Sequence, residues 1–328
     1  MLDRFKRPLR DLRISVTDRC NFRCGYCMPA EIKFKFLPRT ELLSFEEIAI
    51  IAAIFARHGV EKLRLTGGEP LLRRDLDQLI KMLAGIEGIR DIALTTNGFF
   101  LEQRAESLKE AGLDRVTVSF DSLDPETFAS LNGKPVHPDK VLGAIDAAAD
   151  AGLEVKINTV VQRGVNDHEI TDLAALFRKK GHTLRFIEFM DVGNVNGWNM
   201  EKVVPSREVR DHIQKLFPCE PMDPNYSGEV ANRWRYLDGH GEFGLISSVT
   251  EPFCGGCTRA RLSADGELFT CLFAGSGVDL KNPLREENGQ NKVTALLEKV
   301  WTGRDDAYSQ KRSEMTPGEK VEMFKIGG

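Results

Sequence analysis

The chain has 328 residues, of which 41% are hydrophobic and 29% are charged, which is typical of a globular protein and excludes a disordered or fibrous one. The formal net charge is −4, with 45 Lys and Arg against 49 Asp and Glu. This balance excludes a protein whose main task is to grip a nucleic-acid backbone.

Short runs with β-strand composition alternate with helical patterns from residue 12 to residue 189. Six strands are predicted, over residues 12–17, 62–66, 91–95, 115–119, 154–160 and 183–189. Helices are predicted between them, over residues 44–58, 75–83, 101–111, 139–151 and 167–179. Ser44 and Glu47 have the spacing of a capping box, and Gly112, Gly152 and Gly181 each follow a helical run. This alternation predicts a parallel sheet with right-handed crossovers.

The pattern within the strands predicts a sheet whose two faces differ. In residues 12–17, Leu, Ile and Val alternate with Arg, Ser and Thr, whereas strands buried on both faces form continuous apolar runs. The polar face would carry Arg13, Arg64 and Lys156. Because a closed eight-stranded barrel is filled with apolar side chains, we expect a wider, incomplete (β/α)6 TIM-like barrel around a cavity for an anion. The alternative is an antiparallel sheet with one face in water, against which the regular helices argue.

The pattern changes after residue 190. Residues 191–205 are rich in Gly and Asn, as loops are, a helix is predicted over residues 206–217, and short strand-like pieces follow. A boundary between 195 and 220 divides the chain into a barrel core, residues 1–210, and a smaller C-terminal region, residues 211–328. Residues 281–311 carry no motif that we can interpret.

No run approaches the roughly 20 apolar residues that cross a bilayer, and residues 1–10 lack the apolar core of a signal peptide. We therefore expect a cytoplasmic protein without membrane contact. In a reducing compartment, clustered cysteines more often hold metal than form disulfides.

Cys20, Cys24 and Cys27 form a C-x3-C-x2-C loop directly after the first predicted strand. The usual four-iron clusters take four cysteines, so three thiolates would leave one iron open for another ligand, as catalytic zinc sites do. The alternatives are a zinc knuckle or buried free thiols. No histidine lies near this loop to complete a zinc site.

Cys254, Cys257 and Cys271 form a second triplet with C-x2-C-x13-C spacing. A zinc site with a distant fourth ligand is one interpretation. The repeated number of three favours a second cluster with an open iron. Cys219, beside Pro218, is interpreted as an ordinary buried cysteine, with metal ligation as the alternative.

The first cysteine loop, with Tyr26 before its last cysteine, resembles the signature of the radical S-adenosylmethionine enzymes. The segment Gly67-Gly68-Glu69-Pro70 resembles the one with which that superfamily holds the methionine amine. In such enzymes the open iron chelates S-adenosylmethionine, and an electron from the cluster breaks its sulfonium bond to give a 5′-deoxyadenosyl radical.

Over the whole chain, from LRISVTDRC at residues 12–20 to the terminal Gly327-Gly328, the sequence is similar to the GTP 3′,8-cyclase family of molybdenum cofactor biosynthesis. The second cysteine triplet is spaced as in that family, with Arg259 and Arg261 after it. The resemblance implies two [4Fe–4S] clusters, one on each cysteine triplet, and S-adenosylmethionine as cofactor. It implies cofactor contacts at Tyr26, Gly68, Glu69, Ser119 and Met190. Gly68, Ser119 and Met190 also follow predicted strands, where barrel enzymes place their sites.

The same resemblance implies that the second cluster faces the guanine of GTP. Arginine forks and a lysine suit the triphosphate, and the implied contacts are Arg13, Arg64, Thr95, Lys156, Arg259 and Arg261. The radical would remove the hydrogen from C3′, and C3′ would attack C8 to give (8S)-3′,8-cyclo-7,8-dihydroguanosine 5′-triphosphate. The implied catalytic residues are the first cysteine triplet, the two arginines of the second and the tail Gly327-Gly328, which would enter the cavity.

The resemblance also implies partners: an electron donor such as a flavodoxin, the cyclic pyranopterin monophosphate synthase that receives the product, and a second copy of the chain in a homodimer. One rival is another radical S-adenosylmethionine enzyme with an auxiliary cluster that modifies a peptide or small molecule. A second rival is a zinc protein that binds RNA, against which the negative charge and the lack of an aromatic stacking motif argue.

Overall fold

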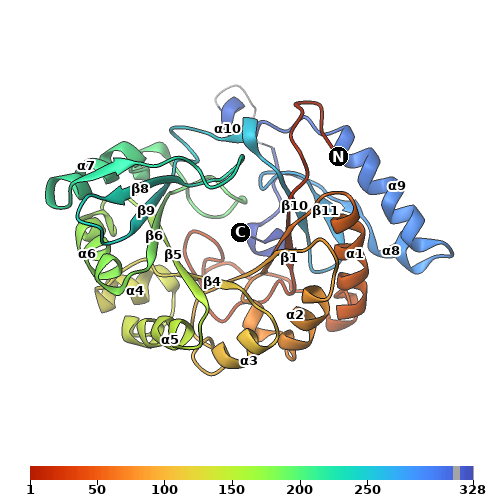
Figure 1. Ribbon diagram of the computed structural model, residues 1–328, viewed down its shortest axis with the longest axis horizontal. Helices are drawn as coiled ribbons and strands as arrows, with labels where there is room; N and C mark the ends of the chain where they lie inside the picture. Colours follow the sequence, from red (N-terminus) through yellow and green to blue (C-terminus); the bar gives the residue numbers. More distant parts are fainter. Residues whose placement is uncertain (313–317, 328) are drawn as a thin grey trace.

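A computed structural model describes residues 1–312 and 318–327. One sheet of twelve strands, in the order β12-β11-β10-β1-β2-β3-β4-β5-β6-β9-β8-β7, curves around the centre of the molecule (Figure 1). Each neighbouring pair among its first six strands is parallel. These strands are β1 (Asp11–Ser15), β2 (Lys62–Thr66), β3 (Asp91–Thr96), β4 (Arg115–Ser119), β5 (Glu154–Val161) and β6 (Thr183–Glu188). The predicted incomplete parallel barrel is confirmed.

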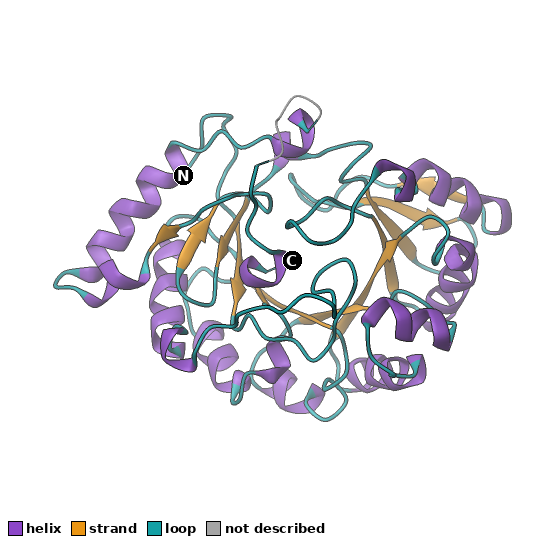
Figure 2. Ribbon diagram, turned by 180° about the vertical axis from the view of Figure 1, so that it is seen from behind, coloured by secondary structure: helices purple, strands orange, loops and turns teal. Residues whose placement is uncertain are grey.

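Helices cover the outside of this sheet (Figure 2). In chain order they are α1 (Phe45–Arg57), α2 (Leu76–Ala84), α3 (Ala105–Glu110), α4 (Pro125–Asn132), α5 (Pro138–Asp150), α6 (Ile170–Lys180) and α7 (Ser206–Leu216). Each predicted helix overlaps one of them, although the helix predicted from residue 101 begins only at Ala105. The sequence analysis missed α4, whose start has two recognisable signals: Asp124 accepts a hydrogen bond from the Thr127 amide, and Pro125 occupies the first helical position.

Local sequence determines where several helices begin and end. The capping box at α1 is confirmed: Ser44 Oγ accepts from the Glu47 amide at 3.2 Å, and Glu47 Oε2 accepts from the Ser44 amide at 2.8 Å. Gly112, Gly152 and Gly181 all have positive φ, and Gly181 caps α6 in the left-handed conformation at φ 73°.

The hydrophobic core lies between the sheet and the outer helices. Leu12 on β1 pairs with Leu63 on β2, and Ile14 pairs with Leu65, so that apolar side chains line up across the sheet. These side chains are buried and belong to the same core as Phe177 of α6. The opposite, polar face therefore points into the barrel, as the alternation within the strands predicts.

The C-terminal region extends both edges of the sheet. β10 (Arg259–Leu262) pairs in parallel with β1, and β9 (Glu242–Ile246) pairs in parallel with β6, so eight consecutive strands are parallel where six were predicted. Antiparallel strands complete the edges: β11 (Glu267–Phe269) and β12 (Val278–Asp279) beyond β10, and β8 (Asn232–Tyr236) and β7 (Cys219–Pro221) beyond β9. The division of the chain at residue 210 stays a prediction.

The last helices lie on both sides of the sheet. α8 (Lys281–Arg285) and α9 (Gly289–Thr302) lie outside, with α9 against α1, whereas α11 (Met323–Ile326) lies against β1 in the centre of the ring (Figure 1). α10 (Tyr308–Lys311) precedes the tail. Short 3-10 helices are η1 (Arg39–Glu41), η2 (Pro70–Leu72), η3 (Asp167–Glu169), η4 (Met200–Lys202) and η5 (Cys254–Gly256). In the part of the chain that the structure describes, no helix has the length and apolarity needed to span a membrane.

Phe177 tests the core between α6 and the sheet. Its ring is fully buried and packs edge-on against Phe120, with ring centroids 5.6 Å apart. We expect Phe177→Ala to lower the free energy of unfolding by about 3–5 kcal/mol, because it leaves a cavity. Phe177→Leu, which keeps most of the volume, should lower it by less than about 1.5 kcal/mol. Urea unfolding measures both, and equal losses in the two variants would contradict this packing.

Candidate functional site

A cavity of about 600 Å³ occupies the inside of the barrel. With the exception of the two tail glycines, every site residue proposed from the sequence lines it. These residues are Arg13, Cys20, Cys24, Tyr26, Cys27, Arg64, Gly68, Glu69, Thr95, Ser119, Lys156, Met190, Cys254, Cys257, Arg259, Arg261 and Cys271. Gly327 is held beside the cavity by Arg261, whose Nη1 donates to its carbonyl oxygen, and Gly328 lies outside the described residues. The fold thus brings together residues from both ends of the chain.

Two glycines allow the Gly67–Pro70 segment to lie directly against the first cysteine loop. A Cβ added to Gly67, which has a φ of 148°, would meet the Thr17 carbonyl oxygen at 2.3 Å, and one added to Gly68 would meet the Arg19 carbonyl oxygen at 2.3 Å. The Gly68 amide donates to Thr17 at 2.8 Å. Any side chain at these positions would push the segment away from the residues that lead into Cys20.

The Glu69 carboxylate joins this segment to the end of β3. It accepts hydrogen bonds from the Leu71 amide at 3.0 Å, Thr96 Oγ1 at 2.7 Å and the Asn97 amide at 2.8 Å. Burial raises the pKa of Glu69 to about 7, against the effect of these donors. Asn97 in turn directs its Nδ2 toward Cys20 Sγ at 3.7 Å. Asn97 was not predicted, although it follows a strand end as the predicted residues do.

Asp121 is a second site residue that the sequence analysis missed. Tyr26 donates its hydroxyl to Asp121 Oδ2 at 2.7 Å, and Asp121 Oδ1 accepts from the Val160 amide at 2.8 Å. Burial raises the pKa of Asp121 to about 6 and also raises that of Tyr26. The pair connects the cysteine loop to the ends of β4 and β5. An acidic residue immediately after a predicted strand was the available signal.

The first cysteine triplet fits a cluster of several irons. Burial raises the pKa of Cys20 to about 11 and that of Cys27 to about 12, and it raises that of Cys24 as well. For Cys24 and Cys27, the negative charge of neighbouring thiolates adds to the effect. Such crowded thiols need positive charge to stay ionised, and bound metal supplies it.

Among residues 1–312 and 318–327, no three His, Cys, Asp or Glu side chains converge as the ligands of a single metal ion do. A four-iron cluster is wider than one ion, so its thiolates stand further apart.

The second cysteine triplet has a different electrostatic environment. Arg259 Nη2 and Arg304 Nη2 lie 3.2 and 3.1 Å from Cys257 Sγ. Although burial alone would raise the pKa of Cys257, the charges of these two arginines lower it to about 6. Burial raises the pKa of Cys271 to about 11. Cys219 lies elsewhere, buried in the hydrophobic core on β7, as predicted for an ordinary buried cysteine.

Cationic side chains from successive strands share the cavity. The predicted Arg13, Arg64 and Lys156 are joined there by Arg115 and Arg185, which the sequence analysis did not single out. Burial, and then the charges of Arg261 and Arg64, hold the pKa of Arg13 well below its usual range. Burial and then Arg64 and Arg115 lower that of Arg185 to about 9. Arg185 alternates with buried apolar residues along β6, so the pattern that revealed Arg13 could have found it.

The C-terminal tail is fastened across the cavity by Asp191, the residue after Met190. The Asp191 carboxylate accepts from the Tyr308 hydroxyl at 2.6 Å, Arg312 Nε at 2.9 Å and Lys320 Nζ at 2.9 Å. Asn194 Nδ2 donates to the Lys320 carbonyl oxygen at 2.5 Å. These contacts connect the loop after β6 to the segment that leads into α11.

Comparisons with known proteins agree with this site. Residues 14–177 match the model of the radical SAM superfamily, and residues 182–310 match that of the family described as Molybdenum Cofactor Synthesis C. The GTP 3′,8-cyclase of Acidothermus cellulolyticus is 54% identical over 97% of this chain and 90% of its own length. That of Aquifex aeolicus is 50% identical over the full length of both.

Solved structures show the same fold at low sequence identity. Streptococcus suis SuiB bound to S-adenosylmethionine has a TM-score of 0.59 at 16% identity and covers 81% of this chain and 60% of that one. The sulfatase-type structure named anSMEcpe with bound AdoMet has a TM-score of 0.51 at 19% identity, with 64% of this chain and 58% of that chain covered.

Asp191 provides a test of how the tail is held. Asp191→Asn removes the charge from three hydrogen bonds, each worth about 1.5–3 kcal/mol when charged. We expect the fraction of molecules with a detached tail to rise about tenfold or more. The rate of tryptic cleavage after Lys320 reports this fraction, because cleavage follows the open population. The exposed Asp150→Asn on α5 is the charge-matched control. Unchanged cleavage in Asp191→Asn would show that other contacts hold the tail.

Proposed function

Since the chain belongs to the GTP 3′,8-cyclases of the radical S-adenosylmethionine superfamily, we propose that the cavity inside its barrel holds cofactor and substrate for that reaction. The enzyme acts in molybdenum cofactor biosynthesis: hydrogen leaves C3′ of GTP, and the C3′ radical attacks C8 of guanine. The product is (8S)-3′,8-cyclo-7,8-dihydroguanosine 5′-triphosphate. The observation that carries the residue assignment is that two cysteine triplets and a set of buried cations line one cavity. The rival reading, a peptide-modifying enzyme, is not favoured by the relatives.

The first cysteine triplet would hold the cluster that binds S-adenosylmethionine. Reductive cleavage of that cofactor supplies the 5′-deoxyadenosyl radical that begins the reaction. Tyr26, Gly68, Ser119 and Met190 would contact the cofactor, and each lines the cavity. Glu69 would act at the same end. Since its oxygens already accept from Leu71, Thr96 and Asn97, its role is to fix the loop that faces the methionine group.

The second triplet, Cys254, Cys257 and Cys271, would hold a second four-iron cluster. Three thiolates leave one iron without a protein ligand, and this iron would face the guanine ring. The proposal is supported by the position of all three cysteines on the cavity wall and by the two arginines that favour the Cys257 thiolate.

The buried cations would bind the triphosphate. Arg13, Arg64 and Lys156 reach the cavity from three neighbouring parts of the barrel, and Arg259 and Arg261 reach it from β10, with Thr95 Oγ1 as a further group. Buried cations that repel one another are costly unless an anion compensates them. Thr95 Oγ1 is itself buried without a hydrogen-bond partner among the described residues. A polyanion such as a nucleoside triphosphate satisfies both.

The tail and the partners complete the proposal. Arg261 contacts the carbonyl oxygen of Gly327, so the tail glycines and this arginine would act together at the substrate during the radical step. An electron donor such as a flavodoxin would reduce the clusters, and the cyclic pyranopterin monophosphate synthase would take the product. The enzyme would work as a homodimer in the cytoplasm, where its thiols stay reduced.

The reaction can be tested with three nucleotide conditions. The protein is loaded with iron and sulfide without oxygen, reduced, and mixed with S-adenosylmethionine and GTP, ATP or no nucleotide. We expect one 5′-deoxyadenosine for each molecule of the 3′,8-cyclised isomer, and only with GTP. Cleavage of S-adenosylmethionine with GTP untouched would mean that the substrate assignment is wrong. The absence of any cleavage in a fully loaded sample would contradict the radical activity itself.

Matched cysteine variants test the second cluster in the same assay. Cys254→Ala and Cys271→Ala should retain the first cluster but lose cyclisation, because the guanine ring loses its anchor. Cys219→Ala removes a buried cysteine outside the cavity and should cyclise GTP normally. Normal cyclisation by Cys271→Ala would contradict the two-cluster assignment.

A further inference from the structure

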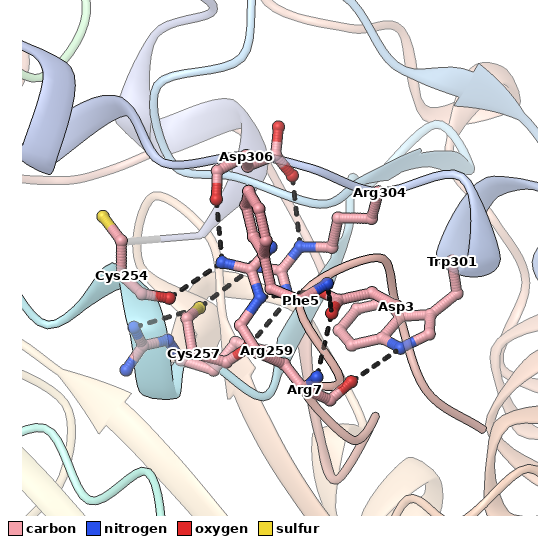
Figure 3. A network of polar contacts seen from close by, with 9 residues as sticks. All are labelled: Asp3, Phe5, Arg7, Cys254, Cys257, Arg259, Trp301, Arg304 and Asp306. Carbon is pink, nitrogen blue, oxygen red and sulfur yellow. Dashed lines mark hydrogen bonds and ion pairs between the residues drawn. The ribbon is translucent and has the colours of Figure 1, made fainter.

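A buried network of charged residues joins the N-terminus to the second cysteine triplet (Figure 3). Asp3, Arg7 and Arg304 are 6%, 2% and 5% exposed. Arg7 Nε donates to Asp3 Oδ2 at 2.6 Å, and Arg304 Nη1 reaches the same oxygen at 3.4 Å. One carboxylate therefore fixes two guanidinium groups that come from segments about 300 residues apart.

Both arginines are directed at the backbone of the cysteine loop. Arg7 Nη1 donates to the Cys254 carbonyl oxygen at 2.8 Å, and Arg304 Nη1 donates to the Cys257 carbonyl oxygen at 2.8 Å. The two ends of the C-x2-C loop are thus each held by one buried arginine. Side-chain donors fix this loop from outside, and its own short helix η5 contributes the turn between them.

Arg304 also contacts a sulfur. Its Nη2 lies 3.1 Å from Cys257 Sγ, while its Nε donates to Asp306 Oδ2 at 3.1 Å. The guanidinium is further held flat, because its central carbon lies 4.6 Å from the centre of the Trp301 ring. Trp301 Nε1 in turn donates to the Arg7 carbonyl oxygen at 3.3 Å. Figure 3 shows these groups packed around Cys257.

A purely structural anchor for the N-terminus would account for only part of this arrangement. Sulfur is a weak acceptor for a neutral partner, so a buried guanidinium gains most from it when the sulfur carries charge. Arg7 Nη2 is buried and has no hydrogen-bond partner among the described residues, and both arginines line the cavity. The network therefore offers donors toward the place where the cluster would lie.

We propose that Asp3, Arg7 and Arg304 form a positioning set for the second cluster, which holds the Cys254–Cys257 loop in ligand geometry and raises the reduction potential of the cluster through N–H donation to Cys257 Sγ. The inference rests on the second cluster of the proposed function. Hydrogen bonds to cysteine sulfur favour the reduced, more negative cluster, and groups that orient metal ligands influence both affinity and potential. None of the three residues needs to touch GTP or S-adenosylmethionine for this role.

The test compares Arg304→Gln and Arg304→Lys with the wild-type protein, all loaded with clusters. The readouts are iron and sulfide content and a redox titration followed by electron paramagnetic resonance. A variant in which Cys20, Cys24 and Cys27 are all alanine assigns the signal of the second cluster. Arg304→Gln should shift the midpoint potential of that signal to more negative values and leave the first cluster unchanged. Arg304→Lys keeps the charge without the fork and should shift it less.

Arg4→Gln is the matched control. Arg4 pairs with Asp305 at 3.0 Å on the same two segments, but these side chains are 63% and 61% exposed. This variant should change neither signal.

The outcomes separate the inference from the proposed function. A wild-type protein that takes up iron for one cluster only would overturn the second cluster, and the inference with it. Two clusters in the wild-type protein, with potentials and iron content unchanged in both Arg304 variants, would overturn the inference alone. If Arg304→Gln does not fold, Arg304→Lys decides: a negative shift confined to the second cluster supports the role, and no shift overturns it.

Discussion

Mutual repulsion between arginines buried in one cavity is the constraint on which the rest of this structure depends. Arg13, Arg64, Arg185 and Arg261 all have lowered pKa values, first because they are buried and then because neighbouring arginines repel them. Buried charges of one sign are costly unless a partner compensates them. A barrel interior built in this way cannot be packed shut, so the sheet stays wide and the space between the strands is available to an anion. The radical chemistry is thus placed where a triphosphate relieves an existing electrostatic cost.

The parallel sheet explains how distant cysteines come to share this space. β1 pairs with β2 on one side and with β10 on the other, so the loop after β1 and the loops around β10 lie at neighbouring positions on the barrel. The first triplet belongs to the loop after β1, and the second surrounds β10 in sequence. The tail then closes over both, held by Asp191 and by Arg261. The N-terminal residues, which lie outside the barrel core in sequence, reach the second triplet through Arg7.

Local patterns in the sequence predicted much of this, and long-range pairing decided the rest. The strands 62–66 and 115–119 and the capping box at Ser44 follow from neighbouring residues alone, and both cysteine triplets are visible as spacings. The parallel pairing of β9 and β10 with the barrel could not be predicted, because short strands carry no record of their partners. The same holds for Asp3 and Arg304, whose contact joins the two ends of the chain. Arg115 and Arg185 were within reach, since each alternates with apolar neighbours, but one inward arginine has no local mark that separates it from a surface charge.

The stability of the loaded protein with nucleotides of different charge tests the central claim most directly. A ligand that binds only the folded state raises the melting temperature according to its affinity. If buried arginines in the cavity await a polyanion, the melting temperature without oxygen should rise in the order GMP, GDP and GTP, and high salt should reduce the differences. Equal shifts for the three nucleotides, or none, would show that the arginines are not compensated by phosphate and would contradict the account.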